Sequence, residues 1–141
     1  MALPQPEDLT SLVLRTDFAD ESAWDALCAA FDALDDHRHA TCVSDRRFAG
    51  AEGAGLAEED GAAEEDERVF HVFLADAAAL ADPSYPLLAV DLEDEPGRTF
   101  RVPLRWFADV SANLSLANMD FAEFADVADD EGGTFRGYGD A

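Results

Sequence analysis

The sequence predicts an α/β fold: a single domain with a mixed, mostly parallel sheet, helices on both faces and a C-terminal helical segment. Short apolar runs alternate with segments of helical periodicity, the pattern of strands joined by crossover helices. The run at 68–76, RVFHVFLAD, is almost entirely apolar, as in a strand covered on both faces. The 141 residues suffice for one core. Since no repeat or change of composition divides them, residues 1–141 are expected to form one domain.

The first half of the sequence predicts a strand, a helix and a second strand. Residues 11–18 are a short apolar run bounded by polar residues, as in a buried strand. Asp20 is a suitable N-cap for the helix that follows. Residues 40–45 predict the second strand, and residues 57–67, AEEDGAAEEDE, are expected to form an acidic surface loop or a frayed helix. The apolar stripe of the helix consists of Trp24, Leu27, Cys28, Phe31 and Leu34.

The second half predicts further strands and then helices. A short alanine-rich helix at 77–82 leads to a strand at 86–92. The connection between the strands at 68–76 and 86–92 is tight for a parallel crossover, so the direction of the later strand is left open. Pro96 and Gly97 suit a type II turn, which predicts a hairpin into a strand that ends at Pro103 and lies at the sheet edge. Helices are expected from there to Asp130.

A helix start is predicted at Asp120, inside the most strongly patterned run of the chain. With Asp120 as the N-cap, Glu123 occupies position N3 and completes a capping box. Met119 and Phe124 then occupy N′ and N4, the two positions of a hydrophobic staple. Two asparagines lie nearby. Asn113 is expected to end the preceding helix, and Asn118 is expected to order the turn. The alternative is that the two residues together bind a ligand.

The charge is strongly one-sided. Thirty-two acidic residues face nine basic ones, for a formal net charge of −23. All nine basic residues are arginine, and isoleucine is absent too. A high-GC genome explains both gaps, because lysine and isoleucine have AT-rich codons, and a salt-adapted source would give a similar surface. The missing basic patch argues against binding to nucleic-acid phosphates. The missing lysine excludes a P-loop and Schiff-base chemistry.

Four aspartates at the ends of predicted strands are the candidate metal ligands. Open α/β sheets bind ligands at the carboxyl ends of their strands, and clustered carboxylates there can hold Mg²⁺. The alternative is that each aspartate caps the helix that follows. Phosphoryl-transfer chemistry is disfavoured for two reasons. The chain has no lysine to neutralise a phosphoryl group, and the sequence around Asp17 lacks an Asp-x-Asp spacing. The four residues are Asp17, Asp45, Asp76 and Asp91.

The histidines and cysteines carry weaker signals. A His-x-His pattern with a neighbouring aspartate could form a small metal site, but a solvated turn is the favoured interpretation; the residues are Asp35, Asp36, His37 and His39. His71 lies in an apolar strand and is interpreted as a hydrogen-bonded core histidine. No nucleophile–histidine–acid arrangement and no Gly-x-Ser-x-Gly motif is found. Cys28 and Cys42 are far apart and are expected to be reduced, packed thiols.

Six sequence blocks carry a resemblance to a known family. They are LVLRTDF, CVSDRRFAG, PLLAVDL, GRTFRV, NLSLANMDFAEFA and GTFRGY, in this order along the chain. In these blocks the sequence resembles an uncharacterised domain-of-unknown-function family of small acidic proteins from high-GC bacteria. The resemblance covers nearly the whole chain and is most specific between residues 113 and 125. It implies a shared fold and genomic source, and it brings no catalytic or binding residue.

Two function classes are left open. The favoured one is a non-catalytic interaction module, such as an immunity protein or inhibitor, whose acidic surface binds a basic protein and which needs no cofactor. The alternative is a small divalent-metal-dependent enzyme that uses the strand-end aspartates. The densest acidic clusters are the expected partner surface: Asp35, Asp36, Glu58, Glu59, Asp60, Glu64, Glu65 and Asp66.

A cytoplasmic location is expected. No apolar run approaches the roughly 20 residues that span a bilayer. The first ten residues lack the basic start and apolar stretch of a signal peptide. Neither observation predicts the oligomeric state.

Overall fold

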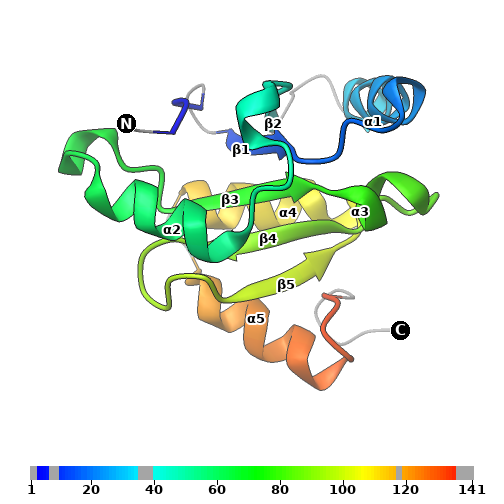
Figure 1. Ribbon diagram of the computed structural model, residues 1–141. Coiled ribbons are helices and arrows are strands. Elements are labelled where there is room, and N and C mark those ends of the chain that lie inside the picture. The colour runs from blue at the N-terminus through cyan, green and yellow to red at the C-terminus, as the bar shows by residue number, and fades with distance from the viewer. Residues whose placement is uncertain (1–2, 7–9, 35–39, 117–118, 136–141) are drawn as a thin grey trace.

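A five-stranded mixed sheet forms the centre of the domain. The computed structural model describes residues 3–6, 10–34, 40–116 and 119–135 (Figure 1). The strand order is β2-β1-β3-β4-β5. The strands are β1 (Ser11–Arg15), β2 (Ala40–Val43), β3 (His71–Ala75), β4 (Leu87–Asp91) and β5 (Thr99–Val102).

Five α-helices and two short 3-10 helices connect or follow these strands. The α-helices are α1 (Glu21–Leu34), α2 (Gly53–Ala62), α3 (Ala77–Ala81), α4 (Leu104–Ser115) and α5 (Phe121–Asp130). The 3-10 helices are η1 (Arg46–Phe48) and η2 (Glu65–Glu67). None of the helices in the described ranges combines the length and the apolar character needed to cross a membrane.

The sheet is mixed, and the prediction that it is mostly parallel is wrong. β1 pairs in parallel with β2 and with β3, whereas β4 pairs antiparallel with both β3 and β5. The physical reason is the short connection from β3 to β4, residues 76–86. A parallel crossover takes about a dozen or more residues, usually including a full helix, and this connection contains only the five-residue α3. The chain therefore turns back, and the carboxyl end of β4 lies at the edge of the sheet opposite to that of β1, β2 and β3.

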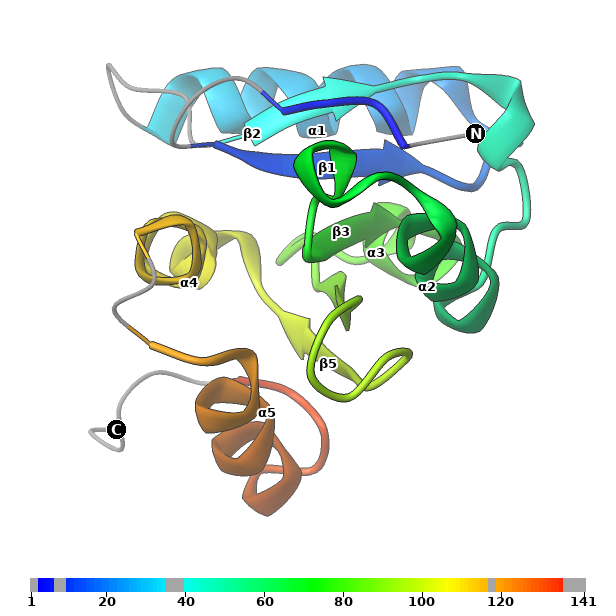
Figure 2. The ribbon, with the colours of Figure 1, turned by 90° about the vertical axis from the view of Figure 1, so that its left-hand side faces the viewer.

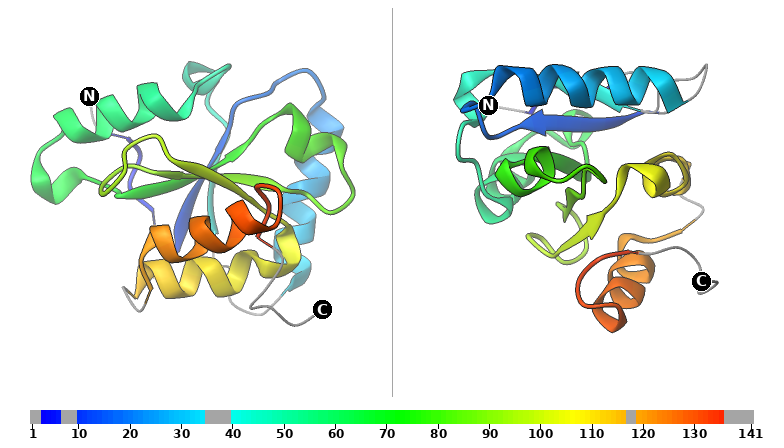
Figure 3. Two further views of the ribbon diagram at one scale, coloured as in Figure 1. Left: turned by 90° about the horizontal axis from the view of Figure 1, so that it is seen from below. Right: turned by 90° about the vertical axis from the view of Figure 1, so that its right-hand side faces the viewer.

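Helices cover both faces of the sheet, as predicted. On one face, α1, α4 and α5 pack on the odd-numbered side chains of β1 and β3, with Val13 and Phe73 at the centre of the cluster. On the other face, α2 and η1 pack on the even-numbered side chains, such as Leu14 and Val72. Figure 2 and the left view of Figure 3 show α2 on the side of the sheet opposite to α4 and α5. This alternation explains why the apolar run at 68–76 is continuous: a strand between two helical layers buries both of its faces.

The acidic segment at 57–67 is more regular than the sequence suggests. Most of it belongs to α2, which begins four residues earlier, at Gly53. A Cβ atom at Gly53 would lie 3.0 Å from Cγ1 of Val90 in β4. Glycine at this position allows α2 to pack closely on the sheet. Glycine also lowers intrinsic helix propensity, and for this reason the sequence does not clearly predict the helix.

The expected start of α5 is present. Asp120 is its N-cap, and it forms a capping box with Glu123, whose carboxylate accepts the Asp120 backbone N–H at 3.2 Å. Phe124 is fully buried, and Met119 packs against the same core cluster. The preceding helix α4 continues past Asn113 to Ser115, so the expectation that Asn113 ends it is wrong. Asn113 instead donates from its side-chain amide to the Asp109 carbonyl at 2.9 Å.

The hairpin between β4 and β5 is also present. Gly97 has a φ of 92°, a conformation that glycine adopts without steric cost. β5 lies at the edge of the sheet and ends directly before Pro103, as expected for a residue that cannot donate to a strand partner.

Candidate functional site

The four aspartates singled out as metal ligands do not meet at one edge of the sheet. Asp17, Asp45 and Asp76 follow the parallel strands β1, β2 and β3, so they lie at the same edge. Asp91 ends β4, which runs the other way, and lies at the opposite edge beside His71. In the described part of the chain, no three histidine, cysteine, aspartate or glutamate side chains are grouped so that they could hold a metal ion.

The three aspartates that share an edge accept structural hydrogen bonds. Asp45 accepts the Arg47 backbone N–H at 3.0 Å as the N-cap of η1, and Asp17 accepts the N–H of Ala19 at 3.4 Å. Asp76 caps α3 and binds the Arg101 guanidinium through both carboxylate oxygens, each at 2.8 Å. Burial alone would raise the pKa of Asp76, but its bonds to Arg101 and to the backbone outweigh burial and lower that pKa. Asp45 and Asp76 thus cap the helices that follow them, as in the alternative interpretation. Asp17 does not: it orders the turn before α1, and Asp20 accepts the Ala23 N–H in the first turn of that helix at 3.2 Å.

The acids expected to meet a partner fall into three groups. Asp35 and Asp36 lie outside the described residues, as do His37, His39 and Asn118. Exposed carboxylates belong to Glu58, Glu64, Glu65 and Asp66. The remaining two are engaged inside the protein: Glu59 in an ion pair with Arg47, and Asp60 in the interior. The prediction that Asp60 is a surface residue is wrong.

Asp60 is a fully buried carboxylate that shapes the start of β3. One of its oxygens accepts the Val69 N–H at 2.8 Å, and the other accepts the Phe70 N–H at 3.2 Å. Phe70 has a φ of 68°, which is an outlier for a bulky residue and is sustained only when neighbouring contacts fix it. The Asp60 carboxylate supplies one such contact, and the Leu92 N–H, which donates to the Phe70 carbonyl at 3.0 Å, supplies another. The Phe70 side chain is 40% exposed.

A small hollow lies beside Phe70, where β3 begins and β4 ends. Its volume is about 110 Å³. Three separate parts of the chain line it: the start of β3, the β4–β5 turn, and the end of α4 with the start of α5. The lining residues are Phe70, His71, Asp91, Glu93, Asp94, Leu114, Met119, Asp120 and Phe121. The hollow therefore joins apolar walls to four carboxylic acids and one histidine, and we call it the acidic hollow.

His71 links the acidic hollow to the interior. Its Nε2 lies 2.9 Å from the Ser11 Oγ, which lies 2.7 Å from the Ser111 Oγ. Most of the imidazole ring is enclosed by protein, and this burial lowers the pKa of His71 to about 4, although the nearby Asp91 carboxylate acts to raise it. His71 is therefore neutral at neutral pH. The prediction of a hydrogen-bonded core histidine holds for the Nε2 side of the ring, while the residue also reaches the hollow.

Ser11, His71 and Asp91 form a serine–histidine–acid grouping that the sequence did not reveal. The grouping does not have the geometry of a nucleophile. The Ser11 side chain is buried, it does not line the hollow, and Ser111 shares its hydroxyl. Both oxygens of Asp91 accept backbone N–H groups of the β4–β5 turn, from Glu93 at 3.0 Å and Glu95 at 2.8 Å. Asp91 thus ties β4 to the turn, and His71 presents a neutral imidazole to the hollow.

The carboxylates around the acidic hollow repel one another. Partial burial and then the negative charges of Asp94, Asp91, Asp120 and Asp60 raise the pKa of Glu93. A raised carboxylate pKa means that the charged form costs free energy at this place. No described arginine forms an ion pair with Glu93, Asp94 or Asp120. The arrangement therefore favours a positively charged group.

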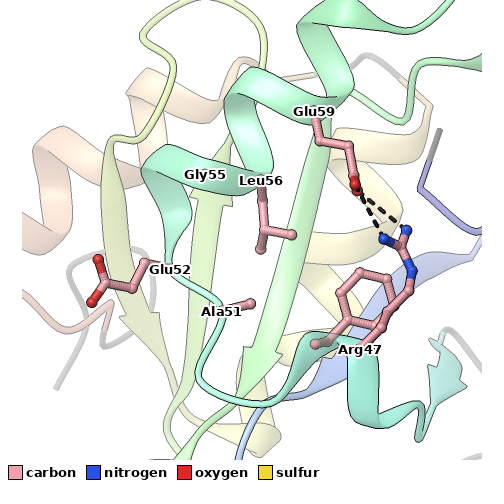
Figure 4. Close-up of a pocket in the computed structure, with 7 residues that line it drawn as sticks. Arg47, Ala51, Glu52, Gly55, Leu56 and Glu59 are labelled. Atoms are coloured by element: carbon pink, nitrogen blue, oxygen red, sulfur yellow. Dashed lines mark hydrogen bonds and ion pairs between the residues drawn. The ribbon is translucent and has the colours of Figure 1, made fainter. Parts of the chain in front are cut away.

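A second hollow lies on the other face, between η1 and α2 (Figure 4). Its volume is about 140 Å³. The Arg47 guanidinium and the Glu59 carboxylate close one side with two hydrogen bonds of 3.1 and 3.2 Å, and Gly55 leaves the helix wall without a side chain. The charges of Arg47 and Glu59 neutralise each other. This hollow therefore binds a charged ligand less favourably than the acidic hollow does.

Acidification should destabilise the protein through His71. The folded-state pKa is about 4 and the ordinary value is 6.5, so between these values the unfolded state binds a proton that the folded state lacks. The free energy of unfolding should therefore fall as the pH drops from 6.5 to 4, by up to about 3 kcal/mol. Urea unfolding at several pH values measures the slope. His71→Gln should remove this part of the slope, and an unchanged slope in the variant would assign the dependence to the carboxylates.

Some residues of the acidic hollow carry sequence signals and others do not. Asp91 and Asp120 stand out as a strand end and a helix cap, and His71 stands out as a histidine within an apolar strand. Phe70 gives no signal, because its exposure goes with a backbone conformation that is held by contacts from residues distant in the sequence, Asp60 and Leu92. Glu93 and Asp94 read as ordinary turn residues. Only the register of β3 with β4 and the packing of α4 and α5 bring these residues together.

A family model described as "Domain of unknown function (DUF6924)" matches residues 10–138. The search of curated proteins gave no match. The matched range includes every residue that lines the acidic hollow.

Proposed function

Since this chain belongs to the DUF6924 family, a domain family of unknown function, we propose its role from its own surface: it is a non-catalytic interaction protein that binds a basic protein partner. The observation that carries the proposal is the acidic hollow, where four carboxylic acids surround an opening with apolar walls. We infer that a lysine or arginine side chain of the partner enters it.

The size and lining of the acidic hollow suit one basic side chain. Its volume of about 110 Å³ is well below the roughly 300–1,000 Å³ of small-molecule sites. Lysine and arginine have apolar stems and charged heads. The stem would pack on Leu114, Met119 and Phe121, and the head would lie among Asp91, Glu93 and Asp94. The exposed Phe70 ring beside the opening offers further apolar contact and a face for a cation.

The long-range charge supports the same kind of partner. A chain with a net charge of −23 creates a negative potential that steers basic proteins towards it and accelerates encounter. The association rate depends on the total charge of the chain, whereas the dissociation rate depends on the groups that contact each other in the complex. The two contributions are therefore separable by experiment.

The test compares two double variants that remove the same charge. A partner is first captured from the source cell and identified, and its binding kinetics are then measured across a salt series. Glu93→Gln with Asp94→Asn removes two charges at the acidic hollow. Asp130→Asn with Glu131→Gln removes two exposed charges at the end of α5, outside the acidic hollow and outside the clusters that the sequence predicts to meet a partner. Both should slow association slightly, but only the first should speed dissociation, by about tenfold or more if a buried charged contact is lost.

Three results would contradict the proposal. Equal dissociation rates in the two double variants would remove the acidic hollow from the interface. A captured partner that is acidic, with association rates independent of salt, would leave the charge without a role in binding. Saturable turnover of a substrate by the protein alone would place it in the enzyme class instead.

A further inference from the structure

A third hollow lies at the opposite end of the sheet, away from the acidic hollow. It is bounded by α1, by the loop between α3 and β4, and by the first turn of α4, and its volume is about 420 Å³. The left view of Figure 3 shows these segments on the same side of the molecule. Its lining residues are Ala30 and Ala33 of α1, Pro83, Ser84 and Tyr85 of the loop, and Leu104 and Arg105 of α4. We call it the apolar hollow.

The described lining of the apolar hollow differs in charge from most of the surface. Acidic residues outnumber basic ones by 32 to nine in the chain, yet none of the described residues that line this hollow is acidic. The one charged residue in this described lining is Arg105, which forms no ion pair with any other described residue. Its guanidinium lies 5.0 Å from the ring centre of Trp106.

The walls of the apolar hollow are held in place before any ligand binds. The Leu104 N–H donates to the Ser84 carbonyl at 3.0 Å, which ties the α3–β4 loop to α4. The Ser84 N–H and hydroxyl both bond to the Asp82 carboxylate, at 2.9 and 2.8 Å. Tyr85 has a φ of 48°, an uncommon conformation for a non-glycine residue. The loop is thus fixed in one arrangement by several contacts, as in a preformed site.

We propose that the apolar hollow binds a small amphipathic carboxylic acid. The hydrocarbon part lies against Ala30, Pro83 and Leu104, and the carboxylate bonds to the guanidinium of Arg105. The volume falls within the range of small-molecule sites, roughly 300–1,000 Å³. A carboxylate fits better than a phosphate, because one arginine offers a single two-pronged contact and the rest of the lining is mainly apolar. This site is separate from the acidic hollow and does not depend on the proposed partner.

Octanoate, with octanol as its neutral counterpart, is a suitable probe. Backbone amide shifts of the full-length protein are followed while each compound is added. Octanoate should bind saturably and move the backbone amide signals of residues 84–85 and 104–105. Arg105→Gln should weaken octanoate binding about tenfold or more, since it removes a charge-assisted hydrogen bond, and should leave octanol unaffected. Arg46→Gln removes the same charge at η1 and should change neither.

A second variant fills the hollow while leaving Arg105 in place. Ala33 is exposed on α1, so Ala33→Phe should fold normally and should weaken the binding of both probes. Absence of saturable octanoate binding would overturn the proposal, and so would octanoate binding that Arg105→Gln leaves unchanged. Self-association that Ala33→Phe abolishes would assign the hollow to a second copy of the chain instead. Octanol that binds as tightly as octanoate would show the carboxylate to be irrelevant.

Discussion

Replacing Phe124 with alanine should lower the free energy of unfolding by about 3 to 5 kcal/mol. Phe124 is fully buried, and its ring centre lies 5.2 Å from that of Phe135 and 6.3 Å from that of Phe100. The truncation would leave a cavity between α5, the edge strand β5 and the segment that follows α5. Urea unfolding at constant pH measures the change, because a shift of the midpoint at constant slope reports stability alone.

Two other substitutions in or next to α5 serve as references for the stability change of Phe124→Ala. Val127→Ala removes a partly exposed apolar side chain from α5, and surface changes of this kind usually stay within about 0.5 kcal/mol. Asp120→Ala removes the N-cap and should cost about 1 kcal/mol. If Phe124→Ala cost no more than Asp120→Ala, α5 would contribute little to the common core, and the described packing of Phe124 would be wrong.

Replacing Asp60 with alanine should destabilise the protein by about 2 to 5 kcal/mol, because it leaves two buried N–H groups without an acceptor. These are the N–H groups of Val69 and Phe70. Asp60→Asn keeps one carbonyl oxygen and should fall between the wild type and alanine. Urea unfolding gives the stability change, and amide shifts show whether Phe70 leaves its left-handed conformation.

The matched control for Asp60 is Glu58→Ala, which removes an acid from the exposed side of the same helix. It should change stability by no more than about 0.5 kcal/mol. Equal effects of the two substitutions would mean that Asp60 acts only as one of many surface charges. A large effect of Asp60→Ala would also link α2 to the acidic hollow, since Asp60 determines where the Phe70 side chain lies.

Local patterns in the sequence were sufficient for most individual elements. The stripe from Trp24 to Phe31 predicts α1, the apolar run before Asp76 predicts β3, and the Asp120–Glu123 pair predicts where α5 begins. These features depend on residues within one or two turns of each other, so the chain encodes them directly. The same applies to the total charge and to the absence of lysine, which exclude several kinds of chemistry whatever the fold.

The tertiary structure alone decided the direction of β4 and everything that depends on it. The antiparallel pairing of β4 with β3 sends Asp91 to the edge opposite Asp76 and places it beside His71. That edge gathers residues near positions 70, 91, 114 and 120 into the acidic hollow. Burial makes Asp60 an acceptor of backbone hydrogen bonds, where the sequence predicts a surface acid. Strand direction and helix packing are long-range contacts, and their free energy depends on partners far away in the sequence. For this reason the sequence identified most of the elements and several of the acids, but only the folded chain brought the residues of both hollows together.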